Sequence, residues 1–126
     1  KRKYNQDELL SIAKKYDFEP FYLEELDLKG QIKLISKTSH IIGPSGSAWS
    51  CLIFNNKYKI KGLSWLPDYL AEACNYSALA YFLGHDLRFI RYDRKYNKNR
   101  HFNFHTDFYT INKKIFEKGI LEILRN

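Results

Sequence analysis

Strand-like and helix-like segments alternate along this chain, and no hairpin signal joins one strand-like segment to the next. Helical spacing of apolar residues predicts helices over residues 5–16, 28–35, 48–54, 71–83 and 111–124. Short apolar or aromatic runs predict strands over residues 18–23, 40–42, 58–63 and 87–92. Parallel strands need crossover connections, and helices are the usual ones. The alternation therefore predicts an α/β domain with a parallel sheet and helices on both faces.

The composition fits a folded globular domain. The chain has 126 residues, of which 44% are hydrophobic and 28% are charged, so one domain can bury a substantial core. No apolar run approaches the ~20 residues that span a bilayer, and no signal peptide is recognisable. Cys51 and Cys74 lie outside any C-x-x-C motif, and we expect free thiols of a cytosolic protein rather than a disulfide. The chain begins with Lys1 and enters a helical pattern at once, so we interpret it as a fragment.

Positive charge is concentrated in two places along a chain whose formal net charge is +7. Residues 88–101 hold six basic side chains against Asp93 alone, residues 1–3 are all basic, and the remainder is nearly neutral. Such patches indicate an anionic partner (phosphates, nucleic acid or acidic lipid head groups) or else a solvated loop and a frayed end. Aromatic residues interleave with the basic loop, as on single-strand nucleic-acid surfaces, at Tyr92, Tyr96, Phe102 and Phe104. A non-catalytic module that binds RNA or another polyanion is therefore one hypothesis.

The sharpest local feature is the junction Ile41-Ile42-Gly43-Pro44-Ser45-Gly46-Ser47-Ala48. Here a buried strand is expected to run into a glycine-containing turn and then into a helix. The first N–H groups of a helix are unpaired and lie at the positive end of its dipole, so such a junction binds phosphate readily. Its glycines would let the backbone approach a ligand, and its serines could donate through their hydroxyls. The demands of the turn alone also account for these residue types.

The same segments allow a hydrolytic and a metal-binding interpretation. Ser45 lies in a pattern close to the nucleophile elbow G-x-S-x-G, although Ser47 occupies the place of the last glycine. Candidate partners for a catalytic triad follow at His85, Asp86, Asp93, His101, His105 and Asp107. His101 and His105 have a spacing that binds metal on a helix, but no third ligand is nearby. No Asp-x-Asp pair occurs, so no metal grip on a diphosphate is expected.

Several short blocks follow one another in a fixed order: Asn5…Glu8-Leu9-Leu10, Glu25-Leu26…Gln31-Ile32, the Gly43–Ala48 junction, Ala78-Leu79-Ala80…Leu83-Gly84, and a terminal amphipathic helix. This order resembles the C-terminal domain of glycosyltransferase family 61, and the Gly-Pro-x-Gly-x-Ala block is its most specific part. The resemblance covers the chain from about Arg2 to Leu124. It implies a Rossmann-like three-layer domain over residues 1–126. Such a domain is the donor-binding C-terminal half of a two-domain, GT-B type enzyme of surface (capsular) polysaccharide synthesis.

The resemblance also implies an inverting, metal-independent transfer of a sugar from a nucleotide-sugar donor, expected to be UDP-linked, to a glycan acceptor. The donor diphosphate would be cradled by Gly43, Pro44, Ser45, Gly46, Ser47 and Ala48, mainly through backbone N–H groups. Arg2 falls where the family has an arginine that could meet donor charge. Asn5 matches an asparagine to which we assign helix capping first and donor binding second.

The partners and location follow from the same resemblance. The family's strand before the first helix and its acceptor-side domain are not in this chain, so that domain is an implied partner and the catalytic base is unassigned. The implied location is the cytoplasm, with contact at the inner face of a membrane left open. Nucleic acid is not an expected partner of such an enzyme.

Three positions depart from the family pattern. Family members usually have histidine in place of Ser45, glycine or alanine in place of Ser47, and a glutamate where this chain has Gly62. The absence of an imidazole or a carboxylate from a donor site typically costs ~1–3 kcal/mol if the group that it would bind is left unpaired. Either the donor differs or this copy has low activity.

Overall fold

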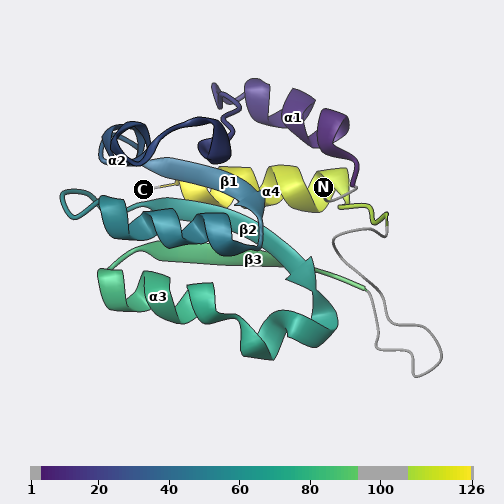
Figure 1. Cartoon of the computed structure of the whole chain (residues 1–126). Helices are drawn as coiled ribbons and strands as arrows, with labels where there is room; N and C mark the ends of the chain where they lie inside the picture. Colours follow the sequence, from purple (N-terminus) through teal and green to yellow (C-terminus); the bar gives the residue numbers. More distant parts are fainter. Residues whose placement is uncertain (1–3, 94–107, 126) are drawn as a thin grey trace.

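The computed structural model describes residues 4–93 and 108–125, and its centre is a three-stranded parallel sheet in the order β1-β2-β3. The strands are β1 (His40–Pro44), β2 (Lys61–Pro67) and β3 (Asp86–Tyr92). The carboxyl ends of all three strands therefore meet at one edge of the sheet (Figure 1). The predicted parallel sheet is confirmed.

Helices cover both faces of the sheet, as predicted (Figure 1). One face carries α1 (Gln6–Lys14) and α4 (Lys113–Leu124), and the other carries η2 (Ser47–Phe54) and α3 (Asn75–Leu83). The remaining elements are α2 (Leu28–Ile35), which packs beside η2, and the short 3-10 helices η1 (Leu23–Glu25) and η3 (Asp68–Ala73). This three-layer α/β architecture is compatible with a Rossmann-like fold. In the part of the chain that the structure describes, no helix is long and apolar enough to cross a bilayer.

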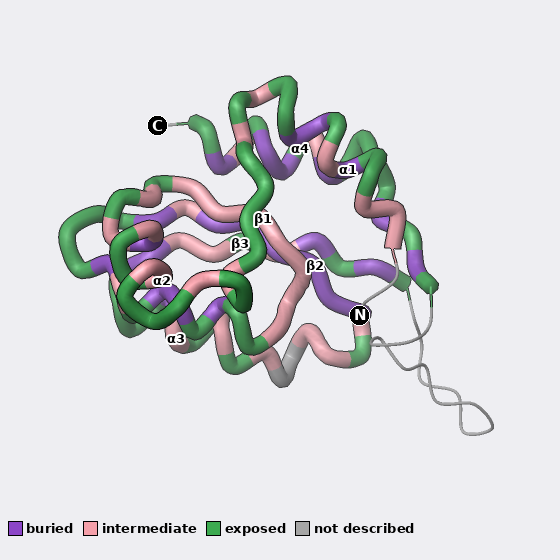
Figure 2. Tube along the Cα trace, turned by 45° about the horizontal axis from the view of Figure 1, so that its top comes forward, coloured by how far each residue is buried: buried purple, intermediate pink, exposed green. Residues whose placement is uncertain are grey.

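The sheet separates two apolar clusters because successive side chains of a strand point to opposite faces. Leu63 and Trp65 of β2 pack with Phe116 and Ile120 of α4 in one cluster. Gly62, the residue before Leu63, faces the other cluster, where the indole of Trp49 lies against it. β2 is accordingly buried from its second residue to its last, as Figure 2 shows. The central strand thus binds both helical layers into one core.

Most of the predicted elements are present, with shifted boundaries. The strand expected from residue 58 begins at Lys61, because the Asn55 side chain accepts the backbone N–H groups of Lys57 and Tyr58 at 3.1 Å each and holds them in a turn. The helix expected over residues 71–83 is divided into η3 and α3, and the helix expected over 48–54 is a 3-10 helix. Gly84 ends α3 with a φ of 75°, as predicted.

The prediction of a strand over residues 18–23 is wrong. Residues 18–22 have no regular structure, and Leu23 begins η1. The segment forms no ladder with any described strand, and Pro20 has no N–H to contribute to one. The segment instead connects α1 to α2 by crossing over β1 (Figure 2).

Candidate functional site

The predicted phosphate-binding junction lies at the carboxyl end of β1, and its six residues occupy three structural positions. Gly43 and Pro44 are the last residues of β1, Ser45 and Gly46 form the connection, and Ser47 and Ala48 begin η2. The expected turn is thus shorter than predicted, because the strand continues through the first glycine and the proline. In open α/β sheets, ligands bind outside the carboxyl ends of the strands.

The junction presents a short row of unpaired backbone donors. The Ser45 N–H still belongs to the sheet, donating to the Trp65 carbonyl at 3.0 Å. The next bonded N–H is that of Trp49, which donates to the Gly46 carbonyl at 3.0 Å. Between them, the N–H groups of Gly46, Ser47 and Ala48 find no acceptor among the described residues, and no side chain caps η2. Ser47 and Ala48 are exposed, so an anion can reach these donors.

A buried hydroxyl lies on the strand that pairs with the end of β1. Ser64 of β2 is fully buried, and its Oγ is the single buried side-chain oxygen or nitrogen without a hydrogen-bond partner in residues 4–93 and 108–125. The register places Ser64 directly opposite Gly43. A Cβ at Gly43 would meet no atom within 4 Å, so space is open there. Ser64 was not identified from the sequence. The feature that could have indicated it is the presence of a small polar residue within a mainly apolar, buried strand.

The two predicted donor residues outside the junction have different outcomes. Arg2 lies outside the described residues. Asn5 does not cap α1, which corrects the first role expected for it. Its amide nitrogen donates to the Ile111 carbonyl at 3.0 Å, and its oxygen accepts the Ile111 N–H at 2.9 Å. Asn5 therefore ties the start of α1 to the approach to α4, and no observation tests its donor-binding role.

Residues 1–59 match the family model described as Glycosyltransferase 61. This part of the chain is similar to the glycosyltransferase 61 family. The match contains α1, α2, β1 and η2, and therefore the whole Gly43–Ala48 junction. The match supports glycosyltransferase activity in general. Searches of curated proteins and of solved structures found no significant match.

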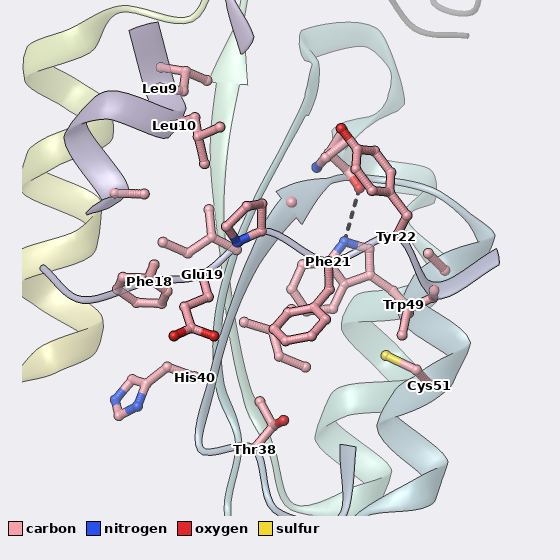
Figure 3. A pocket seen from close by; sticks show the side chains of 18 of the residues that line it. Leu9, Leu10, Phe18, Glu19, Phe21, Tyr22, Thr38, His40, Trp49 and Cys51 are labelled. Atoms are coloured by element: carbon pink, nitrogen blue, oxygen red, sulfur yellow. Dashed lines mark hydrogen bonds between the residues drawn. The ribbon is translucent and has the colours of Figure 1, made fainter. Parts of the chain in front are cut away.

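The structure explains why this chain has glycine at position 62, three residues beyond the end of the family match. A Cβ added there would lie 2.9 Å from Leu87 Cδ1 and 2.9 Å from Trp49 Cζ3. The indole of Trp49 is held in this place by a hydrogen bond from its Nε1 to the Pro44 carbonyl, at 3.0 Å (Figure 3). A glutamate side chain has no room beneath the indole. The departure at position 62 is thus coupled to the packing of Trp49 against the junction.

The hydrolase interpretation fails for the described members of its triad. His85 precedes β3, at the amino ends of the strands, whereas Ser45 follows β1 at the carboxyl ends. His85 is buried, and its Nδ1 accepts the Ile60 N–H at 3.0 Å while its Nε2 donates to the Leu52 carbonyl at 3.1 Å. Both ring nitrogens are therefore occupied by the backbone. The other predicted partners His101, His105 and Asp107 lie outside the described residues.

The described basic residues of the 88–101 segment belong to β3 and have acidic partners. Arg91 Nε lies 3.1 Å from Asp68 Oδ1, and Arg88 lies 3.5 Å from Asp86 and 3.6 Å from Glu122. Residues 94–101, with the other basic side chains, lie outside the described residues, as does the predicted metal pair His101 and His105. Over residues 4–93 and 108–125, no three potential metal ligands come together. The cysteines Cys51 and Cys74 are free thiols, as predicted.

A cavity of about 710 Å³ adjoins the junction. It is bounded by α1, by residues 17–24, by α2 and by β1, and it reaches Gly43, Pro44 and Ala48 (Figure 3). The lining is mainly apolar and aromatic, with Phe21 and Trp49 on the side away from α1. Ala48, which carries one of the unpaired N–H groups, thus also lines this cavity.

Proposed function

We propose that the chain is the donor-binding half of an inverting, metal-independent glycosyltransferase whose junction at residues 43–48 holds the diphosphate of a nucleotide-sugar. The observation that carries this proposal is the row of unpaired N–H groups at Gly46, Ser47 and Ala48, at the carboxyl end of a parallel strand. Backbone donors at the start of a helix bind phosphate oxygens through hydrogen bonds and the helix dipole.

In the proposed reaction, the oxygen of an acceptor hydroxyl forms a bond to the anomeric carbon of the donor sugar. The bond from that carbon to the terminal phosphate oxygen breaks, and its electron pair leaves with the nucleoside diphosphate. Fixed N–H dipoles directed at the departing diphosphate stabilise the charge that develops on it. The acceptor proton passes to a base that we do not assign to any described residue.

Further parts of the proposal come from the family resemblance. We propose a UDP-linked donor, a glycan acceptor of surface polysaccharide, and a GT-B arrangement with an acceptor-side domain as partner. Arg2 and Asn5 are proposed to contribute to the donor site from the start of α1. The proposed location is the cytoplasm, at the inner face of the membrane where lipid-linked acceptors would be presented.

Calorimetry and amide hydrogen exchange test the donor site directly. We expect one of UDP, GDP or CDP to bind, equally well with Mg²⁺ and with EDTA, and to slow exchange at residues 46–48. Ser45→Asp places a carboxylate beside the N–H row and should weaken binding by at least about tenfold, since like charges repel at close range. The matched control is Ser50→Asp, an exposed serine farther along η2, which should keep near-normal affinity. Binding that is absent from the folded chain, or unchanged in Ser45→Asp, would contradict the proposal.

A further inference from the structure

One edge of the sheet is open toward the cavity. Among the described residues β1 pairs only with β2. The Lys61 N–H donates to the Ser39 carbonyl at 2.9 Å, and the Ser45 N–H donates to the Trp65 carbonyl at 3.0 Å. In a parallel ladder, alternate residues of a strand face the same neighbour, so the odd-numbered residues of β1 face β2. The N–H and C=O groups of His40 and Ile42 therefore face the open edge, where no described residue bonds them.

The helical layers extend beyond this edge and enclose a gap at the level of the sheet. Leu10 and Ala13 of α1 line the cavity from one layer, and Leu34 of α2 lines it from the other. Ile42 of β1 lines the same cavity between them. As a consequence β1 is only half-buried along its whole length, in contrast to β2 (Figure 2). The cavity therefore lies between the two helical layers, beside the edge of β1 that no described strand pairs with.

Besides this backbone edge, the cavity lining includes the charged side chains of Asp17, Glu19 and Lys37. The ring of His40 is already engaged, with Nδ1 2.8 Å from the Ser39 hydroxyl and Nε2 3.0 Å from the Ile123 carbonyl. The carbonyl of Pro44 accepts from Trp49. The backbone N–H and C=O groups of His40 and Ile42 remain unpaired among the described residues. They are two residues apart, which is the spacing at which an added strand forms hydrogen bonds.

We propose that this cavity is the seat of a fourth strand, an extended apolar segment of a partner polypeptide that pairs with the free edge of β1. Backbone pairing would occur at His40 and Ile42. Side chains of the added strand would face the apolar residues of both helical layers, because parallel sheets buried on both faces carry continuous apolar runs. The segment over residues 18–22 crosses above this position without strand pairing of its own (Figure 3). This inference does not depend on the chemistry at the neighbouring junction.

Hydrogen exchange followed residue by residue tests the free edge first. In the isolated chain, the His40 and Ile42 amides should exchange at least about tenfold faster than those of Ile41 and Gly43, which pair with β2. A soluble probe peptide, alternating valine and isoleucine over the length of β1 between terminal lysines, should slow His40 and Ile42 by at least about tenfold. The same peptide with alternate amides N-methylated keeps its side chains but cannot pair, and should give no protection.

A pair of variants separates strand pairing from nonspecific binding. Leu10→Glu places a charge in the cavity and should abolish the protection by the peptide. Leu121→Glu changes an exposed leucine of α4 that does not line the cavity, and should leave the protection intact. Unchanged slow exchange in β2 would show that both variants remain folded.

Several results would overturn the proposal. These are slow exchange of His40 and Ile42 in the isolated chain, equal protection by the N-methylated peptide, and no protection by the unmodified peptide in the folded wild type. Protection of these two amides by UDP alone would assign the cavity to the nucleotide instead. Nucleotide binding at residues 46–48 is measured separately, so failure of one proposal leaves the other intact.

Discussion

Polar side chains that sequence patterns single out for chemistry can instead satisfy the backbone. His85 looks like a candidate base beside Asp86, yet its two ring nitrogens hold the Ile60 N–H and the Leu52 carbonyl. The Asn5 side chain forms two hydrogen bonds with the backbone of Ile111 and does not cap α1. Leaving such a buried donor or acceptor unpaired costs about 1–3 kcal/mol, so the fold recruits polar side chains wherever its backbone lacks partners. Residue type and spacing alone cannot separate this use from catalysis.

At the residue scale, Gly62→Ala should destabilise the protein by about 1–3 kcal/mol. The added methyl would lie 2.9 Å from both Trp49 and Leu87, and overpacking of a dense core forces shifts of that cost. Urea unfolding followed by tryptophan fluorescence measures the change. Gly43→Ala is the matched control, because its methyl would enter open space, and it should change the free energy of unfolding by less than about half as much. Equal effects at both glycines would contradict the packing described for Trp49.

A second residue-scale prediction concerns Cys51 and alkaline pH. Burial raises the pKa of its thiol from 9.0 to about 11, because the thiolate is poorly solvated inside the protein. The unfolded chain loses this proton first, so the contribution to stability is complete below pH 9 and is lost as the pH rises toward about 11. The loss should be of order 1–3 kcal/mol. Urea unfolding at about pH 8 and pH 10.5 should show a smaller pH effect in Cys51→Ala than in wild type; identical pH effects would refute this.

At the scale of elements, short local signals determine where a helix begins and ends, but they do not determine whether it is an α-helix or a 3-10 helix. Gly84 ends α3 and Asp27 begins α2, where its carboxylate accepts the Gly30 N–H at 2.7 Å. Both interactions join residues close together in the chain, so the residue types in the sequence predict them. In η2, which is a 3-10 helix, Trp49 instead contacts residues of two strands, Pro44 and Gly62. Element positions were therefore predictable, and the expected α-helix over residues 48–54 was not realised.

Gly84→Ala tests the local signal at the end of α3. The glycine has a φ of 75°, which an alanine adopts only with strain, and no neighbouring atom lies within 4 Å of the added methyl. The substitution should therefore cost about 1 kcal/mol through the backbone alone. Thermal unfolding monitored by circular dichroism measures it. An unchanged or raised melting temperature would show that the strain is relieved elsewhere.

At the scale of the whole molecule, the half that matches the family does not contain its own core. β1 lies within residues 1–59, but β2 and β3, against which the sheet is built, come after that boundary. Three tyrosines that are far apart in the sequence also stack on one another. The ring centroids of Tyr4 and Tyr109 are 5.5 Å apart, and those of Tyr109 and Tyr92 are 4.4 Å apart. Residues near both ends of the chain thus meet at the carboxyl edge of the sheet, where the candidate site lies.

We therefore expect residues 1–59 alone to lack a folded state. Without β2 and α4, the apolar faces of α1 and β1 have nothing to pack against, and helices of this length are marginal in isolation. Near-ultraviolet circular dichroism and urea unfolding of the fragment should show no fixed tertiary structure and no cooperative transition. The 126-residue chain is the control and should unfold cooperatively. A cooperative transition in the fragment would mean that it forms a core of its own.

The sequence by itself determined the α/β class, the order of elements and the place of the Gly43–Ala48 junction, because periodicity, glycine and proline act on neighbouring residues. Only the tertiary structure decided that residues 18–22 form no strand, that Ser64 lies unpaired beside Gly43, and that the edge of β1 is open. These facts depend on which strands become neighbours. Pairing joins residues far apart in the chain, and a local pattern carries no record of the partner that a backbone finds or lacks.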